Sequence, residues 1–258
     1  MPKNPTLIGN HGPAIRALDP WVPSAGRMHQ LLTDEERASL AVIASIVRFK
    51  KGETIYWEGD PAKWVFNIIT GVVTSYRKAP DGNEHIVSFL LQDDLFGLST
   101  EGRYLNSTRA ITAVSAYRIP VTALRSRLSK DAMLEFHIIC NLCQELRQAQ
   151  RHAFLLSQRR AITKLAMFLQ LIEQLQIARG EATLEIHLRM DRSDIGEYIG
   201  ITLPAVSRAF RSLAEQGIIK LRNRGHVRIV DRRAFEEIVG SPVDLQAAGS
   251  LSRSQREQ

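Results

Sequence analysis

The sequence predicts an α+β fold in three consecutive parts: an antiparallel β-roll, a long helix, and two short helices followed by a β-hairpin. Short β-prone runs alternate with turn residues over positions 47–120, which is typical of a small antiparallel barrel or roll. An apolar repeat at helical spacing follows from about residue 131. Beyond it, two short helical patterns meet at Gly200, and two alternating apolar runs come directly after them.

Changes in composition set the boundaries of these parts within the 258 residues. Prolines and glycines without periodicity predict an extended N-terminal arm, and the polar stretch after Gly240 predicts a disordered tail. Thr33-Asp34-Glu35-Glu36 is a capping-box sequence, and the helix that it opens would bury Leu40, Ile43 and Ala44. The expected boundaries are an arm at 1–28, the roll at 29–130, the long helix at 131–157, the helical pair with its hairpin at 158–240, and the tail at 241–258.

The expected strands of the roll are short runs of aliphatic, β-branched and aromatic residues. Turn signals such as Gly59-Asp60, Gly71 and Asp81-Gly82 separate these runs. Turns that recur roughly every 8–12 residues predict strands that pair with their neighbours in an antiparallel arrangement. The runs cover residues 53–57, 64–69, 72–77, 85–91 and 110–119.

The long helix carries an apolar seam with 3-4-3-4-3 spacing, the repeat of a two-stranded coiled coil, which predicts a homodimer. A single amphipathic helix packed on its own roll is the alternative. The seam consists of Ile139, Leu142, Leu146, Ala149, Ala153 and Leu156. Ser157 is expected to cap a further helix over about residues 158–176. The inward residues of that helix would be Ile162, Leu165, Phe168 and Leu169.

The stretch 190–219 predicts two short helices around a tight turn. Asp191 can cap the first helix, and Asp194 lies three residues on, as in a capping box. Gly200 stands at the turn, where two helices must approach closely. The apolar face of the first helix would be formed by Ile195, Tyr198 and Ile199.

The second of these helices is expected to begin at Thr202, its cap, with Pro204 in the first turn, where a missing N–H does no harm. Its buried stripe would be Val206, Phe210 and Leu213. The opposite face carries Ser207, Arg208 and Arg211. A helix that buries one face and offers Ser and Arg on the other meets the requirements for reading the DNA major groove. An ordinary helical hairpin is the alternative.

The hairpin that follows distinguishes these interpretations. Apolar runs at 218–221 and 227–230 flank Asn223-Arg224-Gly225, a turn signal in which the glycine can take a positive φ. Two helices around a turn, followed at once by a hairpin, form a winged helix-turn-helix. The wing carries Arg222, Arg224, His226 and Arg228. These charges could form only a solvated face, but their position after the helical pair favours contacts with phosphates.

Composition limits the classes of function. The formal net charge of +7 suits a polyanionic partner. We find no apolar run near the roughly 20 residues of a membrane helix, and the N-terminus lacks a secretory apolar region. The two cysteines, Cys140 and Cys143, form no disulfide framework, so a reducing cytoplasm is the simplest compartment.

The order of roll, seam helix and winged helix resembles the CRP/FNR family of bacterial transcription regulators, over roughly residues 30–240. Two stretches are especially similar to its FNR and FixK branch: KKGETIYWEGDPAKWVFNIITG and DRSDIGEYIGITLPAVSRAFRSL. The resemblance implies that the roll has the cyclic-nucleotide-binding jelly-roll form. It also implies a homodimer that binds a pseudopalindromic site in double-stranded DNA and recruits RNA polymerase.

The predicted DNA contacts centre on Arg208, which should reach guanine O6 and N7, with Ser207 on a neighbouring base or phosphate. The FNR branch usually carries Glu three residues before this Ser, where this chain has Pro204. We therefore expect an altered half-site, with Leu203 or Pro204 against a thymine methyl. The full set of predicted DNA-contacting residues is Arg192, Ser193, Thr202, Leu203, Pro204, Ser207, Arg208, Arg211, Arg224 and His226.

We expect no cofactor. The N-terminal cysteines that hold the iron–sulfur cluster of FNR are missing, because no cysteine precedes Cys140. The cyclic-AMP pocket of CRP uses a Glu after a glycine and an Arg-Ser pair; here Gly97 is followed by Leu98, and Ser107-Thr108 align with the pair. The alternative is that Arg103 or Arg109 stands in for the missing charge.

Several further signals have a structural and a functional interpretation. Cys140 and Cys143 are expected to be small packing residues; redox control, or a metal held by four thiolates from two subunits, is the alternative. His85 and His137 are expected to be structural rather than haem or metal ligands. Trp57 and Trp64 are expected to pack in the roll, unless they are exposed and contact a ligand or polymerase.

The sequence thus predicts a dimeric, sequence-specific DNA-binding regulator that can act without an effector, as in FixK-like proteins. The alternative is an obligate sensor of a small molecule, haem or redox state, in which a ligand in the roll or the pair Cys140 and Cys143 switches DNA binding. An enzyme is not expected, because clustered barrel ligands, histidine pairs at metal-binding spacing and Gly-rich phosphate loops are all missing from the sequence. For the same reason we predict no metal site.

Overall fold

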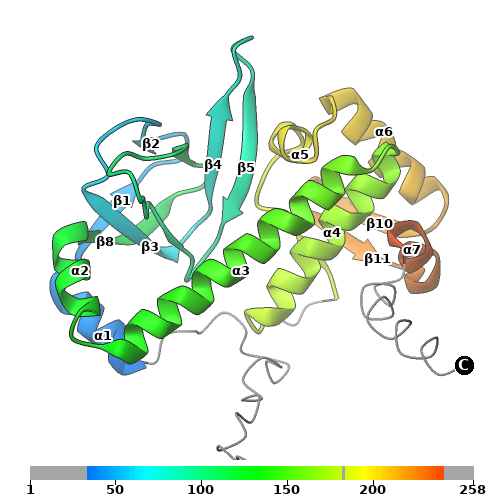
Figure 1. The fold of residues 1–258 in the computed structure, drawn as a ribbon. Coiled ribbons are helices and arrows are strands. Elements are labelled where there is room, and N and C mark those ends of the chain that lie inside the picture. The colour runs from blue at the N-terminus through cyan, green and yellow to red at the C-terminus, as the bar shows by residue number, and fades with distance from the viewer. Residues whose placement is uncertain (1–33, 182–183, 241–258) are drawn as a thin grey trace, which may run out of the picture.

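The computed structural model describes residues 34–181 and 184–240 and has the predicted α+β architecture. A β-roll, a long diagonal helix and a C-terminal helical part with its own small sheet follow one another along the chain (Figure 1). The arm predicted at 1–28 and the tail predicted at 241–258 lie outside the described residues.

Two four-stranded sheets form the roll, and their strand pairs are antiparallel, as the turn pattern predicts. The first sheet has, in spatial order, β1 (Ser45–Phe49), β8 (Val114–Pro120), β3 (Trp64–Thr70) and β6 (Leu95–Phe96). The second has β2 (Thr54–Tyr56), β7 (Ser107–Ala110), β4 (Val73–Lys78) and β5 (Glu84–Leu90).

The run expected at 110–119 is not one strand, because the chain leaves the second sheet after β7 and joins the first at β8. Val72 fixes this turn: its N–H donates to the Thr112 hydroxyl and its carbonyl accepts from the Ile111 N–H, both at 2.9 Å. Gly71 is required beside it, since a Cβ there would lie 2.4 Å from the carbonyl oxygen of Ala113.

Aromatic rings fill much of the space between the two sheets. Phe66 and Phe96 stack with ring centroids 5.2 Å apart, and Tyr56 lies 5.9 Å from Phe66. Tyr56 also stacks on Tyr104 at 3.6 Å. Such rings bury large apolar areas and hold the two sheets together.

Helices close one end of the roll. They are α1 (Asp34–Ile43), α2 (Val121–Leu128), which was not predicted, and α3 (Ala132–Ser157). Leu40 is buried as expected, in one cluster with Leu134 and Ile138 of α3, whereas Ile43 and Ala44 are half-buried at its edge. The predicted capping box cannot be compared, because Thr33 lies outside the described residues.

The helix after α3 begins later than expected. α4 spans Ala161–Ala178 and runs back beside α3 (Figure 1). Ser157 is the last residue of α3, and its hydroxyl donates to the Phe154 carbonyl at 2.7 Å, so the prediction that Ser157 caps α4 is wrong. The predicted inward residues Leu165, Phe168 and Leu169 are fully buried, and Ile162 is partly buried against the same core.

The C-terminal part consists of short helices and a three-stranded sheet packed on α4. Its elements are β9 (Ile186–His187), α5 (Arg192–Ile199), α6 (Leu203–Glu215), β10 (Ile219–Asn223), β11 (His226–Ile229) and α7 (Arg232–Val239). The hairpin β10–β11 was predicted, whereas β9 and α7 were not. The apolar core of this part continues into the roll through Phe89, whose ring lies 5.1 Å from that of Tyr198.

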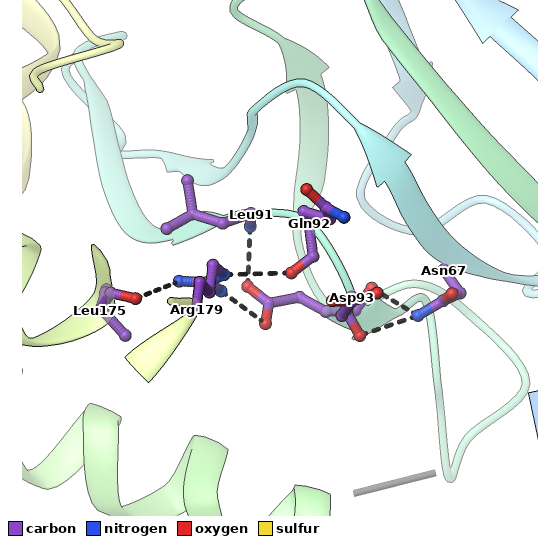
Figure 2. Close-up of polar contacts among 7 residues, drawn as sticks. Asn67, Leu91, Gln92, Asp93, Leu175 and Arg179 are labelled. Atoms are coloured by element: carbon purple, nitrogen blue, oxygen red, sulfur yellow. Dashed lines mark hydrogen bonds and ion pairs between the residues drawn. The ribbon is translucent and has the colours of Figure 1, made fainter. Parts of the chain in front are cut away.

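A polar junction ties the end of α4 to the loop between β5 and β6 (Figure 2). Arg179 forms an ion pair with Asp94 at 3.2 Å and donates to the Gln92 carbonyl at 3.2 Å. The Asp94 carboxylate also accepts from the Leu91 N–H at 2.7 Å. Burial raises the pKa of Asp94 to about 6, although the Arg179 charge opposes this shift. The roll and the C-terminal part therefore share both an apolar and a charged contact.

Candidate nucleic-acid interface

The helix-turn-helix is built on two local devices around α5. The capping box predicted at its start is present: Asp191 accepts from the N–H groups of Ser193 and Asp194, and Asp194 accepts from the Asp191 N–H. Gly200 ends the helix in the left-handed region with a φ of 66°. The stripe of Ile195, Tyr198 and Ile199 is buried, as predicted.

Gly196 is a second required glycine, and it was not predicted. A Cβ at this position would lie 2.7 Å from the carbonyl oxygen of Ile201 and 3.3 Å from Cγ2 of Val206. The turn and α6 therefore pack directly against the α5 backbone. A glycine inside a helical pattern, two residues before the apolar pair Tyr198 and Ile199, is the signal that could have identified it.

The backbone at the start of α6 is as predicted, but the predicted side-chain cap is not formed. Thr202 has the extended conformation of an N-cap, and Pro204 lies in the first turn. Within the described structure the Thr202 side chain makes no capping hydrogen bond, so that part of the prediction is wrong. The stripe of Val206, Phe210 and Leu213 is buried, as predicted. Thr202 keeps its hydroxyl for other partners.

The outer face of α6 brings together most of the predicted base-reading residues. Arg208 and Arg211 are exposed, as are Thr202 and Pro204, while Ser207 is half-buried between them. Leu203 is 48% exposed on the same face. The helix lies at the edge of the molecule (Figure 1).

Arg192 lies in a shallow hollow between α6 and the wing. Its guanidinium packs over the Phe210 ring at 4.3 Å, and the hollow is also lined by Ser207, Arg211 and Glu215. Burial and then the charge of Arg224 lower the pKa of Arg192. The cation is thus held in a fixed place beside α6. Ser193 is exposed at the start of α5.

The wing is a hairpin whose turn is held by Asn223, with a bulge between Leu221 and Asn223. The Asn223 Oδ1 accepts from the Gly225 N–H at 2.8 Å. The glycines that take a positive φ in the described residues do not include Gly225, so that prediction is wrong. Gly225 instead approaches the strand beside it: its carbonyl accepts from the Leu188 N–H at 2.7 Å, and a Cβ would lie 3.2 Å from the Leu188 oxygen.

The basic residues of the wing differ in their surroundings. Arg224 and Arg228 are exposed. Arg222 is exposed as well, but its guanidinium forms an ion pair with Glu185 at 3.5 Å. His226 is half-buried, and its ring packs against His187 at 4.6 Å between centroids. The structure thus presents Arg224 and Arg228 outward and turns His226 partly toward β9.

α3 has two apolar faces. Leu134, Ile138 and Leu155 are buried within the chain. The predicted seam lies one residue further round the helix, and its six members are exposed: Ile139, Leu142, Leu146, Ala149, Ala153 and Leu156. Leu146 is 61% exposed and Ile139 50%. An apolar stripe of this length left in water is typical of a surface that another molecule covers.

Comparison with known proteins agrees with this architecture. A model of the cyclic nucleotide-binding domain matches residues 46–131, and a model of the Crp-like helix-turn-helix domain matches residues 163–238. The nitrogen fixation regulation protein FixK of Bradyrhizobium diazoefficiens is 32% identical over 195 residues, which cover 76% of this chain and 82% of that protein. The chain belongs to the CRP/FNR family of transcription regulators.

Two further proteins support the placement in this family. The transcriptional activator protein anr of Pseudomonas aeruginosa is 32% identical over 217 residues, which cover 83% of this chain and 88% of that protein. The solved structure of FixK2 from Bradyrhizobium japonicum superposes with a TM-score of 0.72 at 29% identity, over 77% of this chain and 98% of that one. The chain is a DNA-binding transcription regulator of the CRP/FNR type, as the sequence predicts.

The candidate substitutes for a cyclic-nucleotide contact in this CRP/FNR regulator have partners within the chain. Arg109 forms an ion pair with Glu84 at 2.8 Å and covers the Tyr76 ring at 4.9 Å. Arg103 donates to the Gly59 carbonyl at 2.7 Å. Ser107 and Thr108, which align with the Arg-Ser pair of CRP, are buried in β7, and Leu98 is 39% exposed.

The cysteines, histidines and tryptophans singled out in the sequence lie in different surroundings in the regulator. Cys140 is half-buried and Cys143 exposed on α3, both as free thiols. His85 is exposed on β5, and His137 is half-buried on α3. Trp64 packs under the Arg118 guanidinium at 4.4 Å. Trp57 is 50% exposed, so its predicted burial in the roll is wrong. None of the helices in the described part of the chain is both long and apolar enough to cross a bilayer.

Proposed function

We propose that this regulator binds a pseudopalindromic DNA site as a homodimer and that it does so without a bound effector. The observation that carries the dimer is the exposed seam of α3, which runs beside an already buried face of the same helix. A two-fold axis along this seam would place two copies of α6 about 34 Å apart, one turn of B-DNA. The regulator would act in the cytoplasm and recruit RNA polymerase there.

In this proposal α6 enters the major groove. Arg208 reads guanine, Ser207 assists it, and Leu203 or Pro204 contacts a thymine methyl. Thr202, whose hydroxyl caps nothing in the described structure, is available to a phosphate. Arg211 and Arg224 are the other expected phosphate contacts, and Arg192, Ser193 and His226 complete the set of predicted DNA-contacting residues.

Independence from an effector is supported by the roll. Aromatic rings occupy its interior, with the Tyr56 and Tyr104 rings in direct contact at 3.6 Å. The arginines closest to the expected cyclic phosphate are held by Glu84 and by the Gly59 carbonyl. A nucleotide would have to break these contacts before it could bind.

The test is selection of DNA from a random pool with purified, ligand-free protein, followed by sequencing. We expect a two-fold motif whose half-sites lie one helical turn apart and share a fixed guanine. A half-site that lacks the cytosine read by the family's usual Glu would reflect Pro204. Failure to enrich any motif would overturn effector independence.

One observation favours the second candidate, a ligand-switched sensor. A cavity of about 230 Å³ lies where the roll, α3 and the C-terminal part meet, and Phe89, Glu145, His152 and Tyr198 are among its lining residues. Its volume is below the roughly 300–1,000 Å³ of most ligand sites, so it suits only a small molecule. Enrichment of a motif only after addition of a small-molecule ligand would favour this candidate, and enrichment only after an oxidant would point to Cys140 and Cys143 instead.

A further inference from the structure

Three potential metal ligands converge at the base of the wing. One ligand atom each from Glu185, His187 and His226 lies within 4.8 Å of the other two. Strand pairing causes this convergence, because His226 of β11 is the direct cross-strand partner of His187 in β9. Glu185 lies two residues before His187, in the bend that leads into β9.

The absence of a metal site was predicted because these residues follow no metal-binding spacing in the sequence. His226 is separated from the other two by α5, α6 and most of the wing. Only β9, which was not predicted, brings them together. Spacing in the sequence can reveal metal ligands that lie on one helix or strand. Here the two histidines lie on different strands, β9 and β11.

The hydrogen bonds around His226 prepare it to bind a metal. Asn223 Oδ1 accepts from the Gly225 N–H at 2.8 Å, which identifies that atom as the amide oxygen. The same oxygen lies 2.9 Å from His226 Nδ1, so this ring nitrogen carries the proton and donates it. Nε2 then keeps its lone pair for a metal, and Asn223 orients the ring as partners of metal-bound histidines do.

His187 is also held in place. Its backbone N–H donates to Oε1 of Gln176 at 3.0 Å, and this glutamine is buried in α4. The first strand of the site is therefore fixed to the core of the C-terminal part. The strand that carries His226 pairs with it, so the three ligand atoms are held within 4.8 Å of one another.

We propose that Glu185, His187 and His226 bind one divalent transition-metal cation, for which Zn²⁺ is the best match. Two imidazoles and one carboxylate are an established ligand set for Zn²⁺, with solvent in the fourth position. All three residues are half-buried, so the cation can enter from solvent.

Metal binding would change the charge that the wing offers to DNA. Glu185 now neutralises Arg222 across 3.5 Å. A cation that takes the Glu185 carboxylate releases the Arg222 guanidinium for a phosphate beside Arg224. This consequence rests on the proposed DNA-binding function, whereas metal binding itself does not.

The first experiment measures Zn²⁺ affinity of the tag-free, full-length protein by competition with a chromogenic chelator. It uses a Cys140→Ser/Cys143→Ser background, so that thiolates do not contribute. We expect one Zn²⁺ per chain, and Co²⁺ should give the visible absorption of a four-coordinate site. Glu185→Gln and His187→Asn should each weaken binding at least about tenfold, whereas the matched control His85→Asn should not.

Two results would overturn the metal site. One is unchanged Zn²⁺ affinity in both Glu185→Gln and His187→Asn. The other is stoichiometric binding by the wild type that disappears in the cysteine-free background. Because Glu185 lies outside the strands, Glu185→Gln keeps the test valid if His187→Asn folds poorly.

The second experiment measures DNA affinity with and without Zn²⁺ as a function of salt. We expect Zn²⁺ to steepen the salt dependence by about 0.9 in log–log slope for each additional phosphate that the protein neutralises, or about 1.8 for a dimer. His187→Asn should bind DNA like the metal-free wild type and ignore Zn²⁺. Zn²⁺ binding without any change in slope would overturn the role of Arg222. Absence of DNA binding under both conditions would contradict the proposed function and leave the metal site standing.

Discussion

Arg208 is the residue on which base selectivity should depend most. Its side chain is exposed on a helix whose opposite face is fully buried, so its replacement removes a contact without disturbing the fold. We expect Arg208→Ala to cost about 1–3 kcal/mol of binding free energy on the selected site and little on random DNA. Fluorescence anisotropy with both DNAs measures the difference.

The matched control is Arg211→Ala, which lies on the same face of α6 and is expected to contact a phosphate. This variant should weaken binding to both DNAs by a similar factor. Equal losses on both DNAs for Arg208→Ala would reduce Arg208 to a phosphate contact and contradict its role as a base reader.

Some single residues were beyond prediction from the sequence. The pattern identified Gly200, because a glycine between two helical stripes is a local signal. It missed Gly196. A glycine is required there because any Cβ would collide with the Ile201 carbonyl, and this contact forms only when the helices pack. It also misplaced Ser157 as a cap for α4, because a serine that donates back to its own helix has the same sequence context.

At the scale of elements, the packing of α5 against the turn and α6 should limit stability. We expect Gly196→Ala to destabilise the protein by about 1–3 kcal/mol, although alanine favours a helix, because the new Cβ would lie 2.7 Å from the Ile201 oxygen. Chemical denaturation gives the free energy of unfolding. Ser126→Ala on the exposed side of α2 is the control and should change it by less than about 0.5 kcal/mol.

α3 carries the second prediction at this scale. Leu146→Glu places a charge in the middle of the exposed seam, where Leu146 is 61% exposed in the single chain. We expect the chain to stay folded but to become monomeric, and to lose more than about tenfold in affinity for a two-fold site. Light scattering after size exclusion reports the mass.

The control for this experiment is Val42→Glu, because Val42 is 85% exposed on α1 and is not part of the α3 seam. It should remain dimeric. A Leu146→Glu protein that still has the mass of a dimer would show that α3 does not form the dimer contact.

Elements with a strong repeat were predicted well, and elements without one were not. The seam helix and the helical pair follow from apolar spacing alone. β9 has only two residues and exists because β11 pairs with it, so it has no periodicity to detect. The split of one expected strand into β7 and β8 depends on hydrogen bonds to Val72, a residue some 40 positions earlier.

At the scale of the whole molecule, burial of the Asp94 carboxyl makes stability depend on pH, and the Arg179 charge only partly offsets this effect. The pKa of the carboxyl is raised by burial to about 6 in the folded chain, so its contribution to stability is complete below the ordinary value of 3.8 and is lost as the pH rises through 6. Between pH 4.5 and pH 7 we expect the wild type to lose about 1–2 kcal/mol of its free energy of unfolding relative to Asp94→Asn. The loss is limited to this range because solvent screens a side chain that is still 26% exposed.

Thermal or chemical unfolding of both proteins across this pH range measures the difference. Asp94→Asn keeps a hydrogen-bonding side chain beside Arg179 but does not titrate, so effects of pH on the rest of the chain cancel in the comparison. A difference that stays constant with pH would contradict the raised pKa of Asp94.

The contact between Phe89 of the roll and Tyr198 of α5 bears on how such regulators can be re-engineered. A chimera that takes its complete C-terminal half from another family member would need a matching surface on the roll, since the core crosses that boundary. Grafting only the outer positions of α6 would leave the boundary intact. New promoter specificities should therefore be obtained more readily by exchanging a few exposed side chains than by exchanging domains.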